Sequence, residues 1–305
     1  MKTIYDLVVV GAGPAGMNAA VYASRYRLKT LVIGELFGGL VSEAYEICNF
    51  LACYRIKGME LAKRMMEHAK AEGAIIKNEK VIGIKKIKDY FEVKTSSGIY
   101  KSRSIILATG TEKRKLNLKN EDELLGKGVS YCATCDAGFF KNKIVGVVGG
   151  GDNALTSALL LAEYSKKVFI IYRRDKFYRA EPAWQEQVAK NKKIKCLFNS
   201  EVIELIGKDK LKAIKLNNGK VMKVDGLFIE IGTIPKKELA EQLNLKLESG
   251  YIVVNRNQET SVKGIFAAGD ITNNPLKQII TAASEGAVAA HSAYEYIAKS
   301  NIKSV

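Results

Sequence analysis

The chain has 305 residues, of which 47% are hydrophobic and 26% are charged. This length exceeds the roughly 250–300 residues at which single cores stop growing, and the composition is globular, so a disordered, fibrous or small disulfide-bonded chain is excluded. Lys and Arg outnumber Asp and Glu by 48 to 32, a formal net charge of +16. The charge attracts anions, but the lysines lie in scattered groups without interleaved aromatic residues, so no nucleic-acid partner is expected.

The first predicted unit is a strand, a glycine-rich turn and a helix near the N-terminus. Leu7–Val10 is an apolar run, residues 11–16 read Gly-Ala-Gly-Pro-Ala-Gly, and a second β run extends from Lys29 to Ile33. The first glycine of such a turn permits the bend, the second lets backbone amides approach a pyrophosphate, and the third position must be small so that helix packs on strand. The pattern predicts dinucleotide binding; a turn needed only for close packing is the alternative.

The stretch from Leu7 to Ser24 carries no charge and approaches the length of a membrane span. Its glycines and proline would break such a helix, and Asp6 lies where an export signal becomes apolar. We therefore expect a soluble, unexported, cytoplasmic protein without a membrane partner. The five cysteines agree, because an odd number that includes a CxxC pair does not suit an extracellular disulfide framework.

The sharpest motif is Cys132-Ala-Thr-Cys135-Asp136. Two thiols at this spacing can close a small disulfide and exchange with a disulfide of another protein, provided that one thiolate is accessible and its pKa is lowered. Asp136 is a candidate acid or base for such a thiol, and an ordinary turn carboxylate is the alternative. Zinc would need two more ligands at matching spacing; Cys196 and the two histidines are isolated, so no metal is expected. A purely structural cysteine pair is the other interpretation.

A second strand, glycine turn and helix begins at Ile144. Residues 149–154 read Gly-Gly-Gly-Asp-Asn-Ala, and another β run extends from Lys167 to Tyr172, which predicts a second dinucleotide site. A β-rich stretch separates the two units, and further β runs lead to residues 264–270 and an Ala-rich helical tail. No linker rich in Pro or Ser divides the chain, so we expect an α/β fold in which one Rossmann-like domain is inserted into another.

Four blocks together resemble the low-molecular-weight thioredoxin reductases, flavoenzymes of the pyridine-nucleotide disulfide oxidoreductase superfamily. They are Gly11–Gly16, Ala108–Gly110, Cys132–Asp136 ahead of the second glycine turn, and Gly264–Asp270 followed by Lys277-Gln278. The resemblance covers nearly the whole chain. It implies an FAD-binding domain made of residues 1–113 and 236–305, with an NAD(P)H-binding domain, residues 114–235, inserted into it and carrying the CxxC.

The resemblance implies FAD and NADPH as cofactors, with NADH as a possible donor. The expected FAD contacts are Gly11, Gly13, Pro14, Ala15, Gly16, Glu35, Gly39, Leu40, Asn49, Val81, Gly110, Gly269, Asp270 and Gln278. Of these, Asp270 would bond the ribityl chain or pyrophosphate, and Gln278 would lie near the flavin ring. The expected NADPH contacts are Gly149, Gly151, Ala154, Arg173, Arg174 and Arg179. The arginines would face a 2′-phosphate; a solvated basic face is the alternative.

The implied reaction passes electrons from NADPH through FAD and the Cys132–Cys135 disulfide to thioredoxin or a glutaredoxin-like protein. Cys135 would face the flavin, Cys132 would attack the partner disulfide, and Asp136 would move the proton. Members of the family are homodimers and rotate the nicotinamide domain, so hinges are expected near Gly110–Lys115 and Gly232–Lys236. The alternatives are a related flavoenzyme with another donor (NADH, ferredoxin) or acceptor (a glutaredoxin-like or peroxidase-system protein), and a nucleotide-holding scaffold that binds nucleic acid.

The chain departs from the family pattern at the NADPH signature. The family has His-Arg-Arg, three residues and Arg, whereas this chain has Tyr172-Arg173-Arg174, four residues and Arg179. One extra residue moves the third guanidinium, so the sequence supports NADPH over NADH less strongly. Some archaeal relatives of this type use neither nucleotide well.

Two further departures lie in the first domain. The acid that usually ends the second strand falls on Gly34, with Glu35 one place later, and Leu40 follows the paired glycines where the family has Gln. Cys48 and Cys53 have the CxxxxC spacing of the glutathione-reductase branch, but Cys48 comes nine residues after Gly39, whereas in that branch the first cysteine follows the paired glycines almost directly. Buried free thiols are therefore expected, with a stabilising disulfide or a catalytic pair as the alternatives.

Overall fold

The computed structural model describes residues 3–302, and its contacts separate into two compact units. The first unit contains residues 3–42, 47–112 and 235–302, and the second contains residues 113–234 with the short segment Glu43–Glu46. The sequence places its boundaries after residues 113 and 235; the main crossings in the structure follow residues 112 and 234. No sequence signal marks Glu43–Glu46 as part of the second unit.

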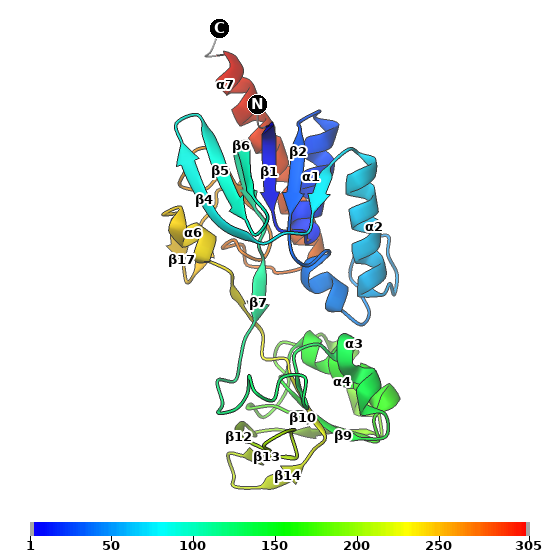
Figure 1. The fold of residues 1–305 in the computed structure, drawn as a ribbon. Helices are drawn as coiled ribbons and strands as arrows, with labels where there is room; N and C mark the ends of the chain where they lie inside the picture. Colours follow the sequence, from blue (N-terminus) through cyan, green and yellow to red (C-terminus); the bar gives the residue numbers. More distant parts are fainter. Residues whose placement is uncertain (1–2, 303–305) are drawn as a thin grey trace. The chain divides into compact units, whose positions relative to one another are not determined.

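The first unit is built around a seven-stranded sheet in the order β3-β2-β1-β6-β5-β4, with β19 paired to β6 outside this path (Figure 1). The strands are β1 (Ile4–Val10), β2 (Thr30–Ile33), β3 (Ile75–Lys77), β4 (Val81–Ile87), β5 (Tyr90–Thr95), β6 (Ile99–Leu107) and β19 (Ile265–Ala267). The β4–β5 hairpin joins β6 antiparallel, and the other pairs are parallel.

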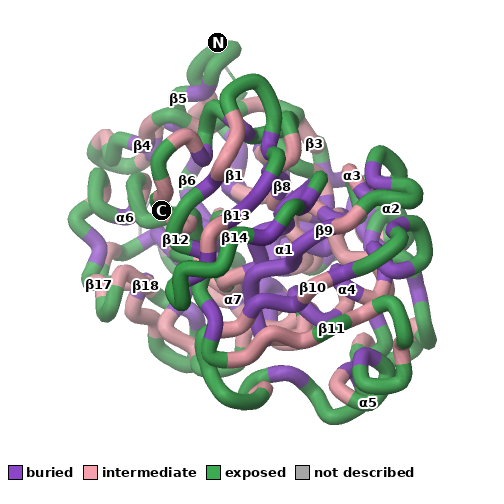
Figure 2. The backbone as a smooth tube through the Cα atoms, turned by 90° about the horizontal axis from the view of Figure 1, so that it is seen from below, coloured by how far each residue is buried: buried purple, intermediate pink, exposed green. Residues whose placement is uncertain are grey.

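Successive residues of β1 enter two different cores, because side chains alternate across a strand. Leu7 and Val9 pack with the helices α1 (Pro14–Arg25) and α7 (Ile279–Ile302), and α2 (Gly58–Ala71) adds Ala69 to this core. Val8 and Val10 pack on the opposite face with residues of the hairpin and of the chain after residue 235. Both faces are therefore covered, which explains why this strand is a continuous apolar run. Figure 2 shows α1 as mostly buried.

Small residues allow α1 and α7 to approach each other closely. A Cβ added to Gly286 would lie 2.1 Å from the carbonyl oxygen of Ala15, so no side chain fits at this position. Pro14 stands at the first position of α1, where a missing N–H costs nothing. The N-terminus of α1 is thereby held against the carboxyl end of β1, the place where the sequence predicts a bound anion.

The second unit repeats this arrangement on a parallel sheet in the order β11-β10-β9-β15-β8. These strands are β8 (Val129–Ser130), β9 (Ile144–Val148), β10 (Lys167–Ile171), β11 (Ile194–Leu197) and β15 (Gly226–Ile229). The helices are α3 (Ala133–Asp136), α4 (Asp152–Tyr164) and α5 (Pro182–Lys190). A separate antiparallel sheet contains β12 (Val202–Ile206), β13 (Ala213–Leu216) and β14 (Val221–Lys223). Helix α4 packs on one face of the parallel sheet, and this small sheet packs on the other.

The predicted α/β fold with two Rossmann-like units is confirmed. The two chain crossings pair with each other as β7 (Thr111–Lys113) and β16 (Thr233–Pro235). The remaining short elements are the 3-10 turns η1 (Gly39–Glu43) and η2 (Ala137–Phe140), with α6 (Glu238–Gln242), β17 (Leu247–Glu248) and β18 (Tyr251–Ile252). Within residues 3–302, no helix has the length and apolar character needed to cross a membrane.

Candidate functional site

The first glycine turn has the geometry that a pyrophosphate requires. Gly11 has a positive φ of 115°, and a Cβ there would lie 2.0 Å from the carbonyl oxygen of Ala108. A Cβ on Gly16 would lie 1.9 Å from the carbonyl oxygen of Gly11, so this position is needed for packing. Gly13 differs, because nothing lies closer than 3.9 Å to its added Cβ and no side chain caps the helix that it begins. Its open backbone leaves room at the position where the sequence predicts the phosphates of a dinucleotide.

The second glycine turn has the same division of roles. Gly149 has φ 146°, and its added Cβ would lie 2.2 Å from the carbonyl oxygen of Glu230 and 2.9 Å from the Cβ of Ala154. Nothing lies within 4 Å of a Cβ on Gly151, which caps α4 without a side-chain acceptor. The turn is therefore closed by packing at its first and last positions and open in the middle, as a nicotinamide dinucleotide requires.

The turn at Gly269 and Asp270 is held by a carboxylate that the sequence did not indicate. The Gly269 amide donates a hydrogen bond of 2.7 Å to Glu285 on α7, and the hydroxyl of Thr272 donates to the same oxygen at 3.3 Å. Glu285 is buried, and burial raises its pKa. An acid inside the Ala-rich segment 282–290 was the available signal for this role.

Asp270 and Lys277 form a half-buried pair beside this turn. Burial raises the pKa of Asp270, and the nearby Lys277 acts against this rise; burial lowers the pKa of Lys277, and Asp270 opposes that shift. The Lys277 ammonium donates to the carbonyl oxygen of Thr272 and lies 4.6 Å from the centre of the Tyr251 ring. These contacts fix the loop on which the proposed cofactor residue Asp270 lies.

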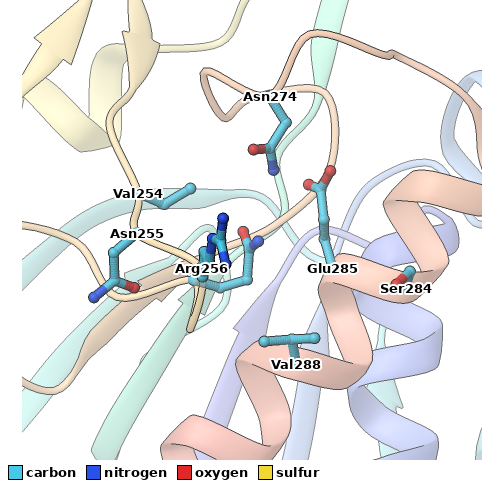
Figure 3. A pocket seen from close by; sticks show the side chains of 8 residues that line it. Val254, Asn255, Arg256, Asn274, Ser284, Glu285 and Val288 are labelled. Carbon is cyan, nitrogen blue, oxygen red and sulfur yellow. The ribbon is translucent and has the colours of Figure 1, made fainter.

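A pocket of about 480 Å³ adjoins the same loop (Figure 3). None of its lining residues is among the positions that the sequence predicts for a cofactor. They are Val254, Asn255, Arg256, Gln258, Asn274, Ser284, Glu285 and Val288. Asn274 and Glu285 project toward each other in this view, and their hydrogen bond acts to lower the pKa of Glu285 against the effect of burial.

Other predicted FAD contacts lie apart in the first unit. The amide nitrogen of Asn49 donates to the side-chain oxygen of Gln278 at 3.2 Å, so these two are brought together. Glu35 is exposed. Gly34 has a physical reason for lacking a side chain, because its Cβ would lie 2.8 Å from the Cβ of Ala12 in the first glycine turn. Val81 begins β4.

Three more of these predicted positions are in loops and short turns of the first unit. Gly39 and Leu40 begin η1, and both are half-buried. Gly110 follows β6 with φ 64°, and nothing lies within 4 Å of its added Cβ. The backbone at Gly110 is therefore open on the side where a side chain would stand.

Cys132 and Cys135 are joined by a disulfide at the start of α3. Cys135 is exposed, whereas Cys132 is half-buried. The Cys135 amide donates a hydrogen bond of 3.2 Å to the Sγ of Cys132. Such a bond favours the charged form of a sulfur, so Cys132 is the sulfur better stabilised as a thiolate after reduction.

Asp136 is held next to the disulfide by Ser130, which the sequence analysis missed. The buried Ser130 hydroxyl lies 2.7 Å from Oδ2 of Asp136, and its oxygen accepts the Cys132 amide at 3.0 Å. One hydroxyl thus connects the predicted acid or base with the backbone of the reactive cysteine. The sequence Ser-Tyr-Cys at residues 130–132 gives no signal for this contact, because the contact depends on how the chain turns between β8 and α3.

An ion pair with a buried carboxylate lies next to the second glycine turn, directly after β15. The Lys113 ammonium lies 2.9 Å from Oε2 of Glu230 and 3.8 Å from a carboxylate oxygen of Glu43. Ser157 donates to the other Glu230 oxygen at 3.2 Å. Burial raises the pKa of Glu230, and Lys113 acts against this shift. The carbonyl oxygen of Glu43 also accepts the hydroxyl of Thr134, between the two cysteines, at 2.5 Å.

The predicted 2′-phosphate arginines follow β10 and are exposed. Tyr172, which replaces the family's histidine, lies half-buried over the glycine turn: a Cβ on Gly150 would lie 2.4 Å from its ring. Arg173, Arg174 and Arg179 therefore lie on the segment that follows β10 and begins beside this turn, where the adenosine end of a dinucleotide is expected.

Cys48 and Cys53 both lie in the first unit, and Cys53 is a free thiol. Cys48 is exposed and Cys53 is half-buried, so the expectation that they are buried is wrong. In the part of the chain that the structure describes, no three His, Cys, Asp or Glu side chains gather where they could hold a metal ion.

Comparison with known proteins gives matches along almost the whole chain. The family model described as pyridine nucleotide-disulphide oxidoreductase matches residues 5–286. Thioredoxin reductase of Bacillus subtilis is 42% identical over 303 residues, which are 97% of this chain and 96% of that protein. The Lactococcus lactis thioredoxin reductase structure has a TM-score of 0.92 at 37% identity, covering 97% of this chain and 99% of its own. The T. acidophilum thioredoxin reductase structure has a TM-score of 0.91 at 38% identity, covering 96% of this chain and 98% of its own.

These matches confirm the predicted resemblance, the flavoprotein oxidoreductase class and the pair of cofactors, FAD and NADPH, that the class implies. The Cys132–Cys135 disulfide fits the redox-active disulfide of such an enzyme. The two glycine turns, each open at its middle residue, are the predicted places for the two dinucleotides. The chain belongs to the pyridine nucleotide-disulphide oxidoreductase family.

Proposed function

We propose that the chain is an NADPH-dependent thioredoxin-disulfide reductase, which passes electrons through FAD and the Cys132–Cys135 disulfide to thioredoxin or a similar small redox protein. The observation that carries the proposal is the disulfide itself. Its Cys135 is exposed, its Cys132 sulfur accepts a backbone amide, and a carboxylate lies in the adjoining turn. The similarity to the thioredoxin reductases of Bacillus subtilis and Lactococcus lactis supports thioredoxin as the acceptor.

Each residue has a task in this reaction. The backbone amides after Gly13 and Gly151 bind the two pyrophosphates, and Asp270 orients the first cofactor. FAD, when bound, supplies two-electron transfer between the nicotinamide and a disulfide. Cys132 attacks the partner's disulfide as a thiolate, because the Cys135 amide stabilises its charge. Asp136, oriented by Ser130, gives and takes the proton that the thiol must exchange.

The experiment that tests the function measures NADPH oxidation by the purified FAD-loaded protein in the presence of oxidised thioredoxin. We expect turnover in the wild type and none in Cys135→Ser, which should still hold FAD. Cys196→Ser is the matched control, because Cys196 is a free, half-buried cysteine on β11 of the same unit. Equal turnover in Cys135→Ser contradicts the proposal. NADH and reduced ferredoxin are tested in parallel, and turnover only with ferredoxin replaces the proposed donor.

The proposal extends to a homodimer and a cytoplasmic location. An aromatic cluster on α1 and α7 supports the dimer. The rings of Tyr26 and Tyr294 stack with their centres 4.8 Å apart, and the ring centres of Tyr22 and Tyr26 are 6.5 Å apart. Both Tyr22 and Tyr294 are exposed. A second copy would remove this apolar area from water. Light scattering coupled to gel filtration tests the dimer, and a monomeric mass contradicts it. The free thiols of Cys53 and Cys196 agree with a reducing compartment.

A further inference from the structure

The extra residue of the nucleotide signature lies in a segment that is fixed beside the second glycine turn. The segment begins at Tyr172, whose ring packs over Gly150, and Phe177 stacks on Tyr172 with ring centres 5.8 Å apart. It ends at Glu181, whose amide donates a hydrogen bond of 2.6 Å to Oδ1 of Asp152, the first residue of α4. Both ends of the segment are thus tied to the place where the pyrophosphate is expected.

Tyr178 is the centre of a cationic group on this segment. Its side chain is exposed. The guanidinium carbon of Arg174 and the ammonium of Lys176 each lie 5.3 Å from the centre of its ring. Its hydroxyl donates a hydrogen bond of 2.9 Å to Oδ1 of Asp175. The Tyr178 side chain therefore contacts the cations of Arg174 and Lys176 through its ring and binds the carboxylate of Asp175 through its hydroxyl.

Stacking on a ring leaves a guanidinium able to bind an anion. The guanidinium carbon of Arg174 lies 5.3 Å from the centre of the Tyr178 ring, and a guanidinium held with its face against a ring would keep its N–H groups for the oxygens of a phosphate. Holding the two side chains in place before binding reduces the rotamer entropy that a ligand would otherwise cost. Across the segment, Arg173, Arg174, Lys176 and Arg179 against Asp175 and Glu181 leave two net positive charges. A dianionic phosphate group is the ligand that this charge suits.

We propose that Tyr178 is a specificity-determining residue, which gathers Arg174 and Lys176 at the adenosine end of the second dinucleotide site and selects a nucleotide with a 2′-phosphate. The inference rests on the proposed function, because it concerns the donor of that reaction. It also gives the extra residue of the signature a role. Lys176 supplies the cation near Arg174 that the displaced Arg179 would otherwise provide.

Nucleotide fragments test this without any turnover. The FAD-loaded full-length protein is titrated calorimetrically with adenosine 2′,5′-bisphosphate and with 5′-AMP, and the ratio of the two dissociation constants is the readout. We expect the wild type to bind the bisphosphate about tenfold more tightly or better. Tyr178→Leu should reduce this ratio roughly three- to tenfold, the size of one or two exposed cation–π contacts, and Tyr178→Phe should keep it within about twofold.

Tyr164→Leu is the matched control, because Tyr164 is an exposed tyrosine at the end of α4 in the same unit, and its ratio should equal that of the wild type. Arg174→Lys keeps the charge but not the flat group, so its ratio should fall even if Tyr178→Leu folds poorly. A wild-type ratio near one, or an unchanged ratio in a Tyr178→Leu variant that melts like the wild type, overturns the inference.

The fragment experiment separates this inference from the proposed function. If thioredoxin is not reduced but the ratios change as expected, the acceptor is wrong and the role of Tyr178 stands. If thioredoxin is reduced and the ratios do not change, the reductase stands and the role of Tyr178 is wrong. A protein that binds neither fragment but accepts electrons from ferredoxin contradicts both the NADPH donor and this inference.

Discussion

The carboxylate of Glu285 accepts a hydrogen bond of 2.7 Å from the backbone amide of Gly269, the residue before Asp270. Gly269 has φ 83°, and a Cβ there would lie 2.9 Å from the Cβ of Ala15 on α1. The buried acid on α7 thus fixes a left-handed turn that is packed against the first glycine-rich unit. This relationship links the last helix with the proposed FAD site.

Replacing Glu285 should loosen FAD without direct contact to it. Glu285→Ala leaves the Gly269 amide without its acceptor, at a cost of about 1–3 kcal/mol for a buried unsatisfied group. Glu285→Gln retains one acceptor oxygen and should behave closer to the wild type. Release of flavin fluorescence during urea titration measures the effect. Equal FAD retention in the alanine variant would show that the turn does not need the carboxylate.

The same residue predicts a pH dependence of stability. Burial raises the pKa of Glu285 in the folded state, so its contribution to the free energy of unfolding is fully present below its ordinary pKa and is lost as pH rises through the folded pKa. As the pH rises above about 4, the urea midpoint of the wild type should therefore fall relative to that of Glu285→Gln. A difference that does not vary with pH contradicts this assignment.

Two glycines of the first turn should respond differently to one methyl group. Gly16→Ala places a Cβ 1.9 Å from a backbone oxygen, so the variant should be strongly destabilised or fail to fold. The nearest atoms to a Cβ on Gly13 are 3.9 Å away, so Gly13→Ala should fold with a nearly unchanged melting temperature. It should bind FAD at least about tenfold more weakly, because the methyl group would occupy the expected place of the pyrophosphate. Thermal melting of the apoprotein and FAD titration separate the two effects. Tight FAD binding by Gly13→Ala contradicts this model.

Ser130 and Asp136 should act together in proton transfer. Asp136→Asn removes the acid or base and should lower thioredoxin reduction by about 10²-fold or more, the usual contribution of such a group. Ser130→Ala leaves Asp136 in place without its hydrogen bond, so a smaller loss with an altered pH profile is expected. The rate of exchange with oxidised thioredoxin, followed from pH 5 to 9, is the measurement. A Ser130→Ala profile identical to the wild type would mean that the hydroxyl only supports the backbone of Cys132.

The sequence allowed the glycine turns and the CxxC disulfide to be predicted because their chemistry lies within a few residues. The side chains that could not be predicted interact across long sequence separations. Lys113 and Glu230 are 117 residues apart in the chain, and Ser157 and Glu230 are 73 residues apart. Gly34 shows a different reason. The expected ribose acid is replaced by a glycine whose backbone packs against Ala12, a requirement that exists only once the strand and the turn are in contact.

The buried pair of Lys113 and Glu230 gives the last prediction. Only 4% of the Glu230 side chain is exposed, and 19% of that of Lys113. Lys113→Met leaves a buried carboxylate beside the second glycine turn without its cation, and breaking such a pair typically costs about 3–5 kcal/mol. Burial already raises the pKa of Glu230, and removing Lys113 removes an effect that opposes this rise. The stability that depends on protonated Glu230 is present below its ordinary pKa and is lost as pH rises.

The destabilisation of Lys113→Met should therefore be large at pH 7 and small near pH 4, and the added substitution Glu230→Gln should recover most of it at pH 7. Urea unfolding of the single and double variants at both pH values measures this, with Lys115→Met as the control because the Lys115–Asp122 pair is half exposed or more. A Lys113→Met effect that is equal at both pH values, or no recovery in the double variant, would mean that Lys113 stabilises the unit through packing of its methylene chain and not through its charge.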